Sequence, residues 1–317
     1  MQRAISRLTS LRGQLTTPVA VSYSSCRTFS GIPKSETNSQ SVACLIIGDE
    51  ILNGKTHDTN SNYLAKKCFD FGLDLRRIQV VPDVEQDIIE SVRELSRQYH
   101  WVFTSGGIGP THDDITYQSI AKAFDLPLAY HEPTLEKMRM IMPLTLVDGK
   151  SRTNPAPLVM TEARKRMALL PVDPNGEERT RVVFPSTQLW VPLVIVNQNV
   201  HILPGVPKLF RVLIDRYFET HVRPTLSLPS YSRVLIGTSL FEGDIAPILT
   251  DIQEKVQLEG IKIGSYPRWR PGGVRVDEGN VRVVVSLLGR DKEALDKWGK
   301  VVAQKIQGVY VENIDTE

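Results

Sequence analysis

The sequence predicts two domains in series, a three-layer α/β domain with a mostly parallel sheet and, after it, a small α+β domain. The 317 residues are enough for about two domains with their own hydrophobic cores. Short apolar runs alternate with amphipathic segments over roughly residues 42–222, which is typical of a parallel sheet covered by helices. From residue 232 onwards the order of expected strands and helices changes.

The first domain begins with a buried strand. Val42–Ile47 is a continuous apolar run, as expected for a strand covered on both faces. A polar loop to Asn60 leads into a helix with Leu64 and Cys68 on its inner face and Gly72 after its end. Loops are expected at residues 143–158 and 171–187, which are rich in Pro, Asn, Gly and charge. The other expected elements are strand Leu75–Val81, a helix capped by Asp83, strand Trp101–Thr104, helices Ile115–Phe124, Pro133–Met142 and Met160–Leu169, strands Leu193–Val196 and Val200–Leu203, and helix Lys208–Phe218.

The second domain is expected at residues 232–317, after a linker at 223–231 that contains Pro224 and Pro229. Its order of elements is strand, helix, strand, strand, helix, strand, which suggests a ferredoxin-like fold. The expected elements are strand Ser232–Ile236, a helix from Ile245 to Val256, strands Ile261–Ser265 and Val281–Leu288, a helix from Leu295 to Val302, and strand Gly308–Val311.

The composition bears on several classes of protein. The 38 Lys and Arg residues against 36 Asp and Glu give a formal net charge of +2, which does not favour binding to nucleic acid. No apolar run approaches the ~18 residues that a membrane-spanning helix needs. The three cysteines form no CxxC pair, so neither a disulfide framework nor a zinc cluster is expected. We therefore expect no nucleic-acid partner and no membrane span.

Residues 1–40 have the composition of a mitochondrial transit peptide and a disordered lead. No acidic residue precedes Glu36, whereas arginine stands at positions 3, 7, 12 and 27. Transit peptides share such an arginine- and serine-rich amphipathic start, so a matrix location is expected. The alternative is a tail whose arginines occur by chance. Apolar residues recur at helical spacing opposite the arginines, at Ile5, Leu8, Leu11 and Leu15.

The strongest motif is Thr104–Thr116, with the sequence TSGGIGPTHDDIT. It lies between an expected strand and an expected helix, where open α/β sheets bind ligands. Its glycines let several backbone N–H groups point at one anion, and the following helix adds its positive end. A tight turn without a ligand would also use glycines. The residues expected to bind phosphate are Ser105, Gly106, Gly107, Gly109 and Thr111.

Two acidic pairs are expected at the same edge of the sheet. Asp113 and Asp114 end the glycine motif, and Asp49 and Glu50 follow the first strand. If both loops converge, four carboxylates surround an anion site, and their repulsion is severe unless a cation intervenes. Oxygen ligands suit Mg²⁺ or Mn²⁺, so metal-assisted attack of water on a phosphoryl centre is expected. The alternatives are helix caps for Asp113 and Asp114 and a solvated turn for Asp49 and Glu50.

Five further residues are expected in the pocket wall. Asp58 and Asn60 follow the first acidic pair, and His112 stands beside Asp113. His112 could ligate the metal or carry a proton, although a loop histidine is more often a bystander. Pro204 and Gly205 begin the sequence PGVP after an expected strand, and either wall the pocket by rigidity or form an ordinary turn.

Gly48–Gly54 with Asp58–Asn60, then Thr104–Thr116, then Pro204–Pro207 form three motifs in a fixed order. They resemble those of the molybdopterin-binding (MoaB/Mog-like) domain, and most closely those of its CinA branch. The resemblance covers about residues 42–222 and implies the fold of that domain. Gly264–Pro267 and the small domain resemble the N-terminal half of eukaryotic FAD synthases, here as a stand-alone version without their adenylyl-transferring domain.

The resemblance also implies roles for the site. In molybdopterin adenylyltransferases of this fold, the glycine loop binds the pterin phosphate, and an aspartate matching Asp114 assists a metal and the adenylyl group. Asp113 stands where those enzymes usually carry arginine, which disfavours pterin adenylylation. In the CinA branch and in the FAD-synthase half, the resemblance implies metal-dependent hydrolysis of dinucleotide pyrophosphates such as ADP-ribose or FAD. It further implies a homo-oligomer.

The leading hypothesis is therefore a mitochondrial pyrophosphatase with a divalent cation, Mg²⁺, Mn²⁺ or Co²⁺, as cofactor. We assign catalysis to Asp49, Asp113 and Asp114, and metal binding to Asp49, Glu50 and Asp114. The expected ligand is a nucleotide or a pterin. The alternatives are a binding module without turnover and a step in molybdenum-cofactor synthesis.

Overall fold

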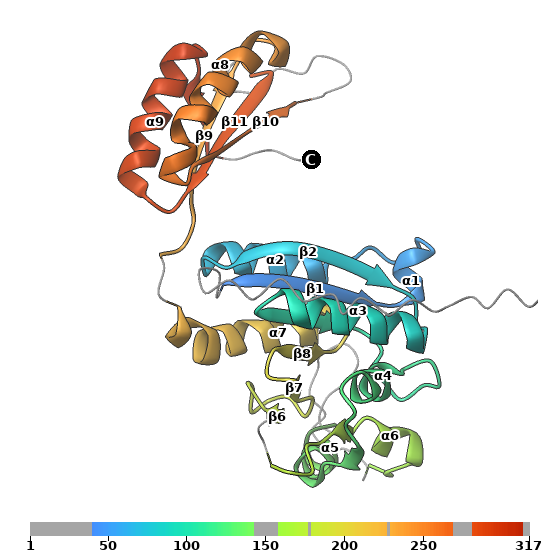
Figure 1. Cartoon of the computed structure of the whole chain (residues 1–317). Coiled ribbons are helices and arrows are strands. Elements are labelled where there is room, and N and C mark those ends of the chain that lie inside the picture. The colour runs from blue at the N-terminus through green and yellow to red at the C-terminus, as the bar shows by residue number, and fades with distance from the viewer. Residues whose placement is uncertain (1–39, 143–157, 177–178, 227–228, 269–280, 313–317) are drawn as a thin grey trace, which may run out of the picture. The chain divides into compact units, whose positions relative to one another are not determined.

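The computed structural model describes residues 40–142, 158–176, 179–226, 229–268 and 281–312. Except for Gln40, the expected transit peptide lies outside these residues, as does nearly all of the expected loop 143–158. Two sheet domains are present, and each is described by itself (Figure 1).

The first domain is built on a six-stranded sheet with the strand order β2-β1-β3-β8-β7-β6. The neighbours β2, β1, β3 and β8 are parallel, whereas β8, β7 and β6 pair antiparallel. This arrangement confirms the predicted α/β class with a mostly parallel sheet. The strands are β1 (Ser41–Ile47), β2 (Asp74–Val81), β3 (Trp101–Ser105), β6 (Thr180–Val183), β7 (Leu193–Val196) and β8 (Val200–Leu203).

Helices cover both faces of this sheet. One face packs against α3 (Glu85–Gln98) and α4 (Thr116–Ala123), and the other against α2 (Asn60–Asp70) and α7 (Pro207–Tyr217) (Figure 1). All seven residues of β1 are buried, and alternate side chains enter the two cores because successive residues of a strand point to opposite faces. Two short turns extend the chain beyond α7, a π-helical turn at Phe218–Val222 and a 3₁₀ turn at Arg223–Thr225.

The loop after β1 differs from the prediction. Residues Asp49–Leu52 form a short helix, α1, where a polar loop was expected. Asp83 was expected to cap α3, but that helix begins at Glu85 without a side-chain cap. The Asp83 carboxylate instead accepts a hydrogen bond of 3.0 Å from the backbone N–H of Asp49. A contact between two loops has therefore replaced the local cap, and no pattern within either loop indicates it.

The middle of the chain is only partly as predicted. Helix α5 (Glu132–Ile141) matches the expectation, but α6 spans only Glu162–Arg166 within the longer helix expected there. The chain then forms β5 (Leu169–Pro171), which pairs antiparallel with β4 (Leu128–Tyr130). The expected loop 171–187 contains β6, the edge strand beside β7. Strands of three or four residues are too short to show a period in the sequence, and pairing with a neighbour decides them.

The second domain has an antiparallel sheet with the order β10-β11-β9-β12. Its helices α8 and α9 pack on one face of this sheet through a shared apolar core that includes Ile236, Ile245 and Leu295. The predicted small α+β domain and its order of elements are confirmed. The elements are β9 (Ser232–Thr238), α8 (Glu242–Val256), a 3₁₀ turn at Gln257–Glu259, β10 (Lys262–Pro267), β11 (Val283–Gly289), α9 (Lys292–Lys305) and β12 (Val309–Tyr310).

Of the helices in the described ranges, none is long and apolar enough to cross a membrane.

Candidate functional site

A cavity of about 500 Å³ opens at the carboxyl ends of β1, β3 and β8. Three chain segments that are far apart in sequence form its polar side: α1 with the turn leading into α2, the loop after β3, and the turn between β8 and α7. The carboxyl ends of parallel strands meet at one edge of a sheet, and this is where open α/β sheets bind ligands. The three sequence motifs therefore meet at one place.

The glycine loop packs tightly against its neighbours at Gly106. This residue has φ +116°, and a Cβ there would lie 2.0 Å from the carbonyl oxygen of Ile47, at the end of β1. A Cβ on Gly205, in the turn after β8, would lie 3.2 Å from the Cα of Gly106. Backbone meets backbone at both points, so only glycine at position 106 allows the three strand ends to come together.

The loop after β3 presents unpaired backbone donors. Gly106 N–H donates to the carbonyl of Leu203, but the N–H groups of Gly107, Ile108 and Gly109 find no acceptor among the residues that the structure describes. All three residues line the cavity. Consecutive free N–H groups in such a turn form a concave site for an anion, because each presents a partial positive charge to the same point.

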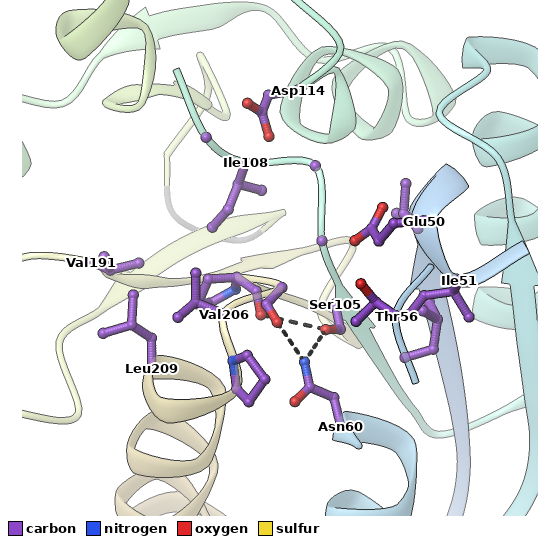
Figure 2. A pocket seen from close by; sticks show the side chains of 18 of the residues that line it. Glu50, Ile51, Thr56, Asn60, Ser105, Ile108, Asp114, Val191, Val206 and Leu209 are labelled. Carbon is purple, nitrogen blue, oxygen red and sulfur yellow. Dashed lines mark hydrogen bonds between the residues drawn. The ribbon is translucent and has the colours of Figure 1, made fainter. Parts of the chain in front are cut away.

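Asn60 connects all three segments, as Figure 2 shows. Its Nδ2 donates to Ser105 Oγ at 2.9 Å and to the carbonyl of Gly205 at 2.8 Å. Ser105 Oγ in turn contacts the carbonyl of Pro204 at 3.4 Å. Asp58 Oδ1 accepts the backbone N–H of Asn60 at 2.9 Å and so holds the first turn of α2. The order of the cavity therefore depends on one buried amide.

Three acidic residues line the cavity: Glu50 from α1, Asp58 from the turn before α2, and Asp114 from the glycine loop. The Glu50 carboxylate folds over Gly48, where a Cβ would lie 2.6 Å from Glu50 Oε2. Asp114 Oδ2 accepts the backbone N–H of Thr111 at 2.9 Å and also the Thr111 hydroxyl. Figure 2 shows Glu50 and Asp114 close to the glycine loop.

The expected Asp58 is in the cavity wall, but the other member of each acidic pair lies elsewhere. Asp49 and Asp113 are not among the residues that line the cavity, and the His112 side chain is 98% exposed, 3.9 Å from Asp113. Thr111 contacts Asp114 but does not line the cavity. Neighbouring residues of a helix or tight turn point in different directions, so only one member of each acidic pair faces inward. Among the described residues there is no group of three or more His, Cys, Asp or Glu side chains placed to hold a metal ion.

Asp83, which the sequence predicts only as a helix cap, also lies at this acidic edge. Burial raises the pKa of the Asp83 carboxyl above the usual value, and the nearby charges of Asp49, Glu50 and Asp113 raise it further. The hydrogen bond from the Asp49 N–H lowers this pKa and offsets part of the rise. Asp83 follows β2, the neighbour of β1, so its place at this edge could have been inferred from the strand order.

An apolar wall faces the polar residues. Figure 2 shows Val191, Val206 and Leu209 across the cavity from Glu50. Met167 and Trp190 also line the cavity; Met167 lies in the helix expected at Met160–Leu169, and Trp190 lies in a stretch with no expected element. Tyr117 from α4 is buried, burial raises the pKa of its hydroxyl, and no described residue bonds to that hydroxyl. Apart from Val206, which belongs to the Pro204–Pro207 motif, these wall residues carry no motif, so only the fold locates them.

Comparison with known proteins supports this arrangement. The family described as probable molybdopterin binding domain matches residues 43–227, and the FAD synthase middle domain matches residues 230–315. A probable FAD synthase of Caenorhabditis elegans is 33% identical over 236 residues, which are 72% of this chain and 44% of that protein. This chain therefore spans less than half the length of that relative.

Two further relatives cover more of their own length. A protein of Pyrobaculum calidifontis is 32% identical over 237 residues, which are 74% of this chain and 81% of that protein. Among solved structures, the protein CinA of Thermoplasma acidophilum, described as of unknown function, is 26% identical, with a TM-score of 0.46 over 57% of this chain and 96% of its own.

The fold and the cavity define a class of α/β protein that binds a small molecule at the carboxyl edge of its sheet. Within that class, the chain belongs to the probable molybdopterin binding domain family. Its second domain matches the FAD synthase middle domain.

Proposed function

We propose that this chain is a metal-dependent nucleotide pyrophosphatase that splits a dinucleotide such as FAD, into FMN and AMP, or ADP-ribose. The observation that supports this proposal best is the row of free N–H groups at Gly107–Gly109 between the carboxylates of Glu50 and Asp114 and the apolar wall. A dinucleotide has a diphosphate that the N–H groups can bind and planar rings that can pack on the apolar wall. A site built for phosphate alone would not need the wall.

The residues of the chain have distinct roles in this proposal. The N–H groups of Gly107, Ile108 and Gly109 bind and orient phosphate oxygens. The apolar wall holds a ring and excludes water from one side of the cavity. Asp114 and Glu50 orient the attacking water and accept its proton. Asn60 keeps the three segments in register so that these groups face the same phosphate.

The donor set fits a divalent cation such as Mg²⁺, Mn²⁺ or Co²⁺ that arrives with the substrate. Mg²⁺ is usually bound by one or two carboxylates together with substrate phosphates, and it does not require a cage made only of protein groups. Glu50 and Asp114 are two such carboxylates, and they would hold the ion. When bound, the cation neutralises phosphate charge and polarises a phosphoryl oxygen. Asp49 and Asp113 do not line the cavity, so this set leaves them out; their charges help to raise the pKa of Asp83 at the same edge.

The substrate class is supported by the relatives. The second domain matches the middle domain of FAD synthase, and two Caenorhabditis relatives are named probable FAD synthases. These relatives are longer proteins, so their activity transfers to this chain only as a proposal. An FAD-related dinucleotide is the substrate that agrees with both the names and the cavity.

The test is incubation of the purified chain with FAD or ADP-ribose and Mg²⁺, Mn²⁺ or Co²⁺, with AMP measured by chromatography. We expect AMP release that is lost on chelation of the metal and that falls at least about 100-fold in Asp114→Ala. His112→Ala is the control, because it changes an exposed residue of the same loop outside the cavity. AMP release by Asp114→Ala at the wild-type rate would refute the assignment.

Experiments on the same purified chain distinguish two other functions. A binding module without turnover is favoured by the lack of a three-ligand metal group among the described residues, and would show tight nucleotide or pterin binding without product. Adenylylation of a pterin is favoured by the family description, and would show adenylylated pterin formed from ATP. Either result, without AMP release from a dinucleotide, would refute the proposed hydrolase function and support the corresponding alternative.

A further inference from the structure

The loop that carries Asp114 is exposed. Pro110, Thr111, His112 and Asp113 are all exposed, and Asp114 is half-buried although it lines the cavity. The Asp114 carboxylate lies against Gly109, where a Cβ would be 2.6 Å from Asp114 Oδ2. Exposed segments with few contacts open locally at low cost, so the contacts between this loop and the rest of the fold decide how firmly Asp114 is held.

The hydrogen bonds inside the loop do not connect it to the rest of the fold. Thr111 donates twice to the Asp114 carboxylate, and Asp114 N–H donates to the Thr111 carbonyl at 3.3 Å. These contacts make the Thr111–Asp114 turn compact, but they join only residues of that turn. Across the described ranges, the stretch 110–114 makes one hydrogen bond with another element: Arg166 Nη2 donates to the Asp114 carbonyl at 3.0 Å.

Arg166 is well placed for this contact. It is the last residue of α6, and the next two residues, Met167 and Ala168, are buried in a small core with Leu135 and Met138. Met167 also lines the main cavity. The segment that reaches the loop is therefore fixed to the fold and forms part of the ligand wall.

A second, much smaller cavity of about 20 Å³ lies beside this contact. Arg166 and Gln118 line it together with Ile108, Gly109, Asp114 and Tyr117, and those last four residues also line the main cavity. Arg166 thus lies behind the wall formed by the glycine loop, and it does not line the main cavity itself.

We propose that Arg166 is a positioning residue that fixes Asp114 at the mouth of the cavity through the Asp114 carbonyl, without contacting the substrate. This inference rests on the proposed hydrolase only for its kinetic consequence. A guanidinium suits the task because its hydrogen bond to a carbonyl is charge-assisted and its planar geometry is rigid. Its charge also offsets the acidic edge at a point where the cavity lining, as far as it is described, contains no lysine or arginine.

The kinetic test compares Arg166→Met with Arg164→Met. Arg164 is a matched control because it lies on the same helix, its guanidinium also donates to a backbone carbonyl, that of Val159, and its loss removes the same charge. We expect Arg166→Met to lower kcat about 10- to 100-fold, as for a misplaced catalytic group, with KM for the dinucleotide changed less than about threefold. Arg166→Lys should recover part of kcat, because an ammonium can still donate to the carbonyl.

A second readout does not depend on turnover. Hydrogen exchange of the peptide that spans Gly106–Gln118 should become faster in Arg166→Met, most of all at Thr111 and Asp114, and should stay unchanged in Arg164→Met. If the wild type releases no AMP, the proposed function fails, and this exchange still decides the role of Arg166. Should Arg166→Met fail to fold, the same measurement is made on Arg166→Lys. Exchange faster than in the wild type supports the proposal, and exchange that is equal or slower overturns it. Equal exchange and equal kcat in the Arg166 and Arg164 variants would overturn it.

Discussion

Replacing Asn60 by aspartate changes one NH₂ group to an oxygen at the point where the three cavity segments meet. The side chain is 5% exposed, and both Nδ2 hydrogens are used, by Ser105 Oγ and by the carbonyl of Gly205. The aspartate oxygen would face the Gly205 carbonyl at the 2.8 Å now spanned by a hydrogen bond. The Ser105 hydroxyl can turn toward the new oxygen only by giving up its hydrogen bond to the Pro204 carbonyl, and the Gly205 carbonyl has no hydrogen to donate.

The cost follows from these two contacts and from the new charge. Each lost hydrogen bond removes about 0.5–1.5 kcal/mol, and an unsatisfied buried acceptor costs about 1–3 kcal/mol. Aspartate also brings a negative charge into a position that is 5% exposed, so we expect Asn60→Asp to lower the free energy of unfolding by at least about 3 kcal/mol. For a domain of this size, each kcal/mol shifts Tm by about 2–4 °C, so Tm should fall by at least about 6 °C.

Thermal unfolding at pH 7, followed by circular dichroism, measures this shift. Asn60→Ala removes both donors but adds no opposing oxygen, so it should cost less than Asn60→Asp. Asn53→Asp is the control, because Asn53 is exposed and uses its side-chain oxygen to accept the N–H of Lys55, which aspartate can also do. If Asn60→Asp and Asn53→Asp unfold within about 1 °C of each other, Asn60 does not hold the segments together.

Three further outcomes are expected. Gly106→Ala should destabilise the protein by more than about 3 kcal/mol, because the new Cβ meets the Ile47 carbonyl. Gly54→Ala, at a residue with positive φ but open space around it, should cost about 1 kcal/mol. Urea unfolding compares the two variants, and equal costs would contradict the packing argument. Burial lowers the pKa of His201 to about 4, so the unfolded chain binds a proton that the folded chain does not between pH 6.5 and 4. Stability should therefore fall by about 3 kcal/mol as the pH drops through this range, and His201→Asn should flatten that part of the profile of unfolding free energy against pH. Residues 1–40 fused to a fluorescent protein should direct it to mitochondria, and replacing Arg3, Arg7 and Arg12 by alanine should leave it in the cytosol; import of both fusions would remove the basis of the matrix prediction.

Long elements with a clear period were predictable from the sequence. The buried run of β1, the apolar faces of α2 and α3, and Gly72 with φ +70° after α2 each follow from local chemistry that tertiary packing did not override. The meeting of the three motifs was also predictable, since parallel strands direct their carboxyl ends to one edge.

The orientation of single side chains was not predictable. Four carboxylates were expected to surround the anion, but which member of each pair faces inward depends on the turn of α1 and on the bonds from Thr111 to Asp114. Asp83 was assigned to its own helix because the hydrogen bond to Asp49 joins residues 34 positions apart. A contact between loops that are far apart in the chain cannot be predicted from the local sequence pattern of either loop.

The wall residues and Arg166 were missed for a related reason. Met167 and Arg166 come from a segment whose short helix and strand are settled by pairing with β4 and by packing on α5. A sequence of five helical residues followed by three strand residues shows neither period clearly. The secondary structure of such a segment can be assigned only when the elements it packs against are known.

The cavity is assembled from two independent sources, since glycine backbone supplies its polar side and exchangeable side chains supply its apolar side. Backbone donors are not removed by most substitutions, so under the proposed function affinity for a phosphorylated compound would be hard to lose. Met167, Trp190 and Leu209, by contrast, can be replaced one at a time. Under the same proposal, selectivity among phosphorylated heterocycles could diverge within this architecture while phosphate binding is retained.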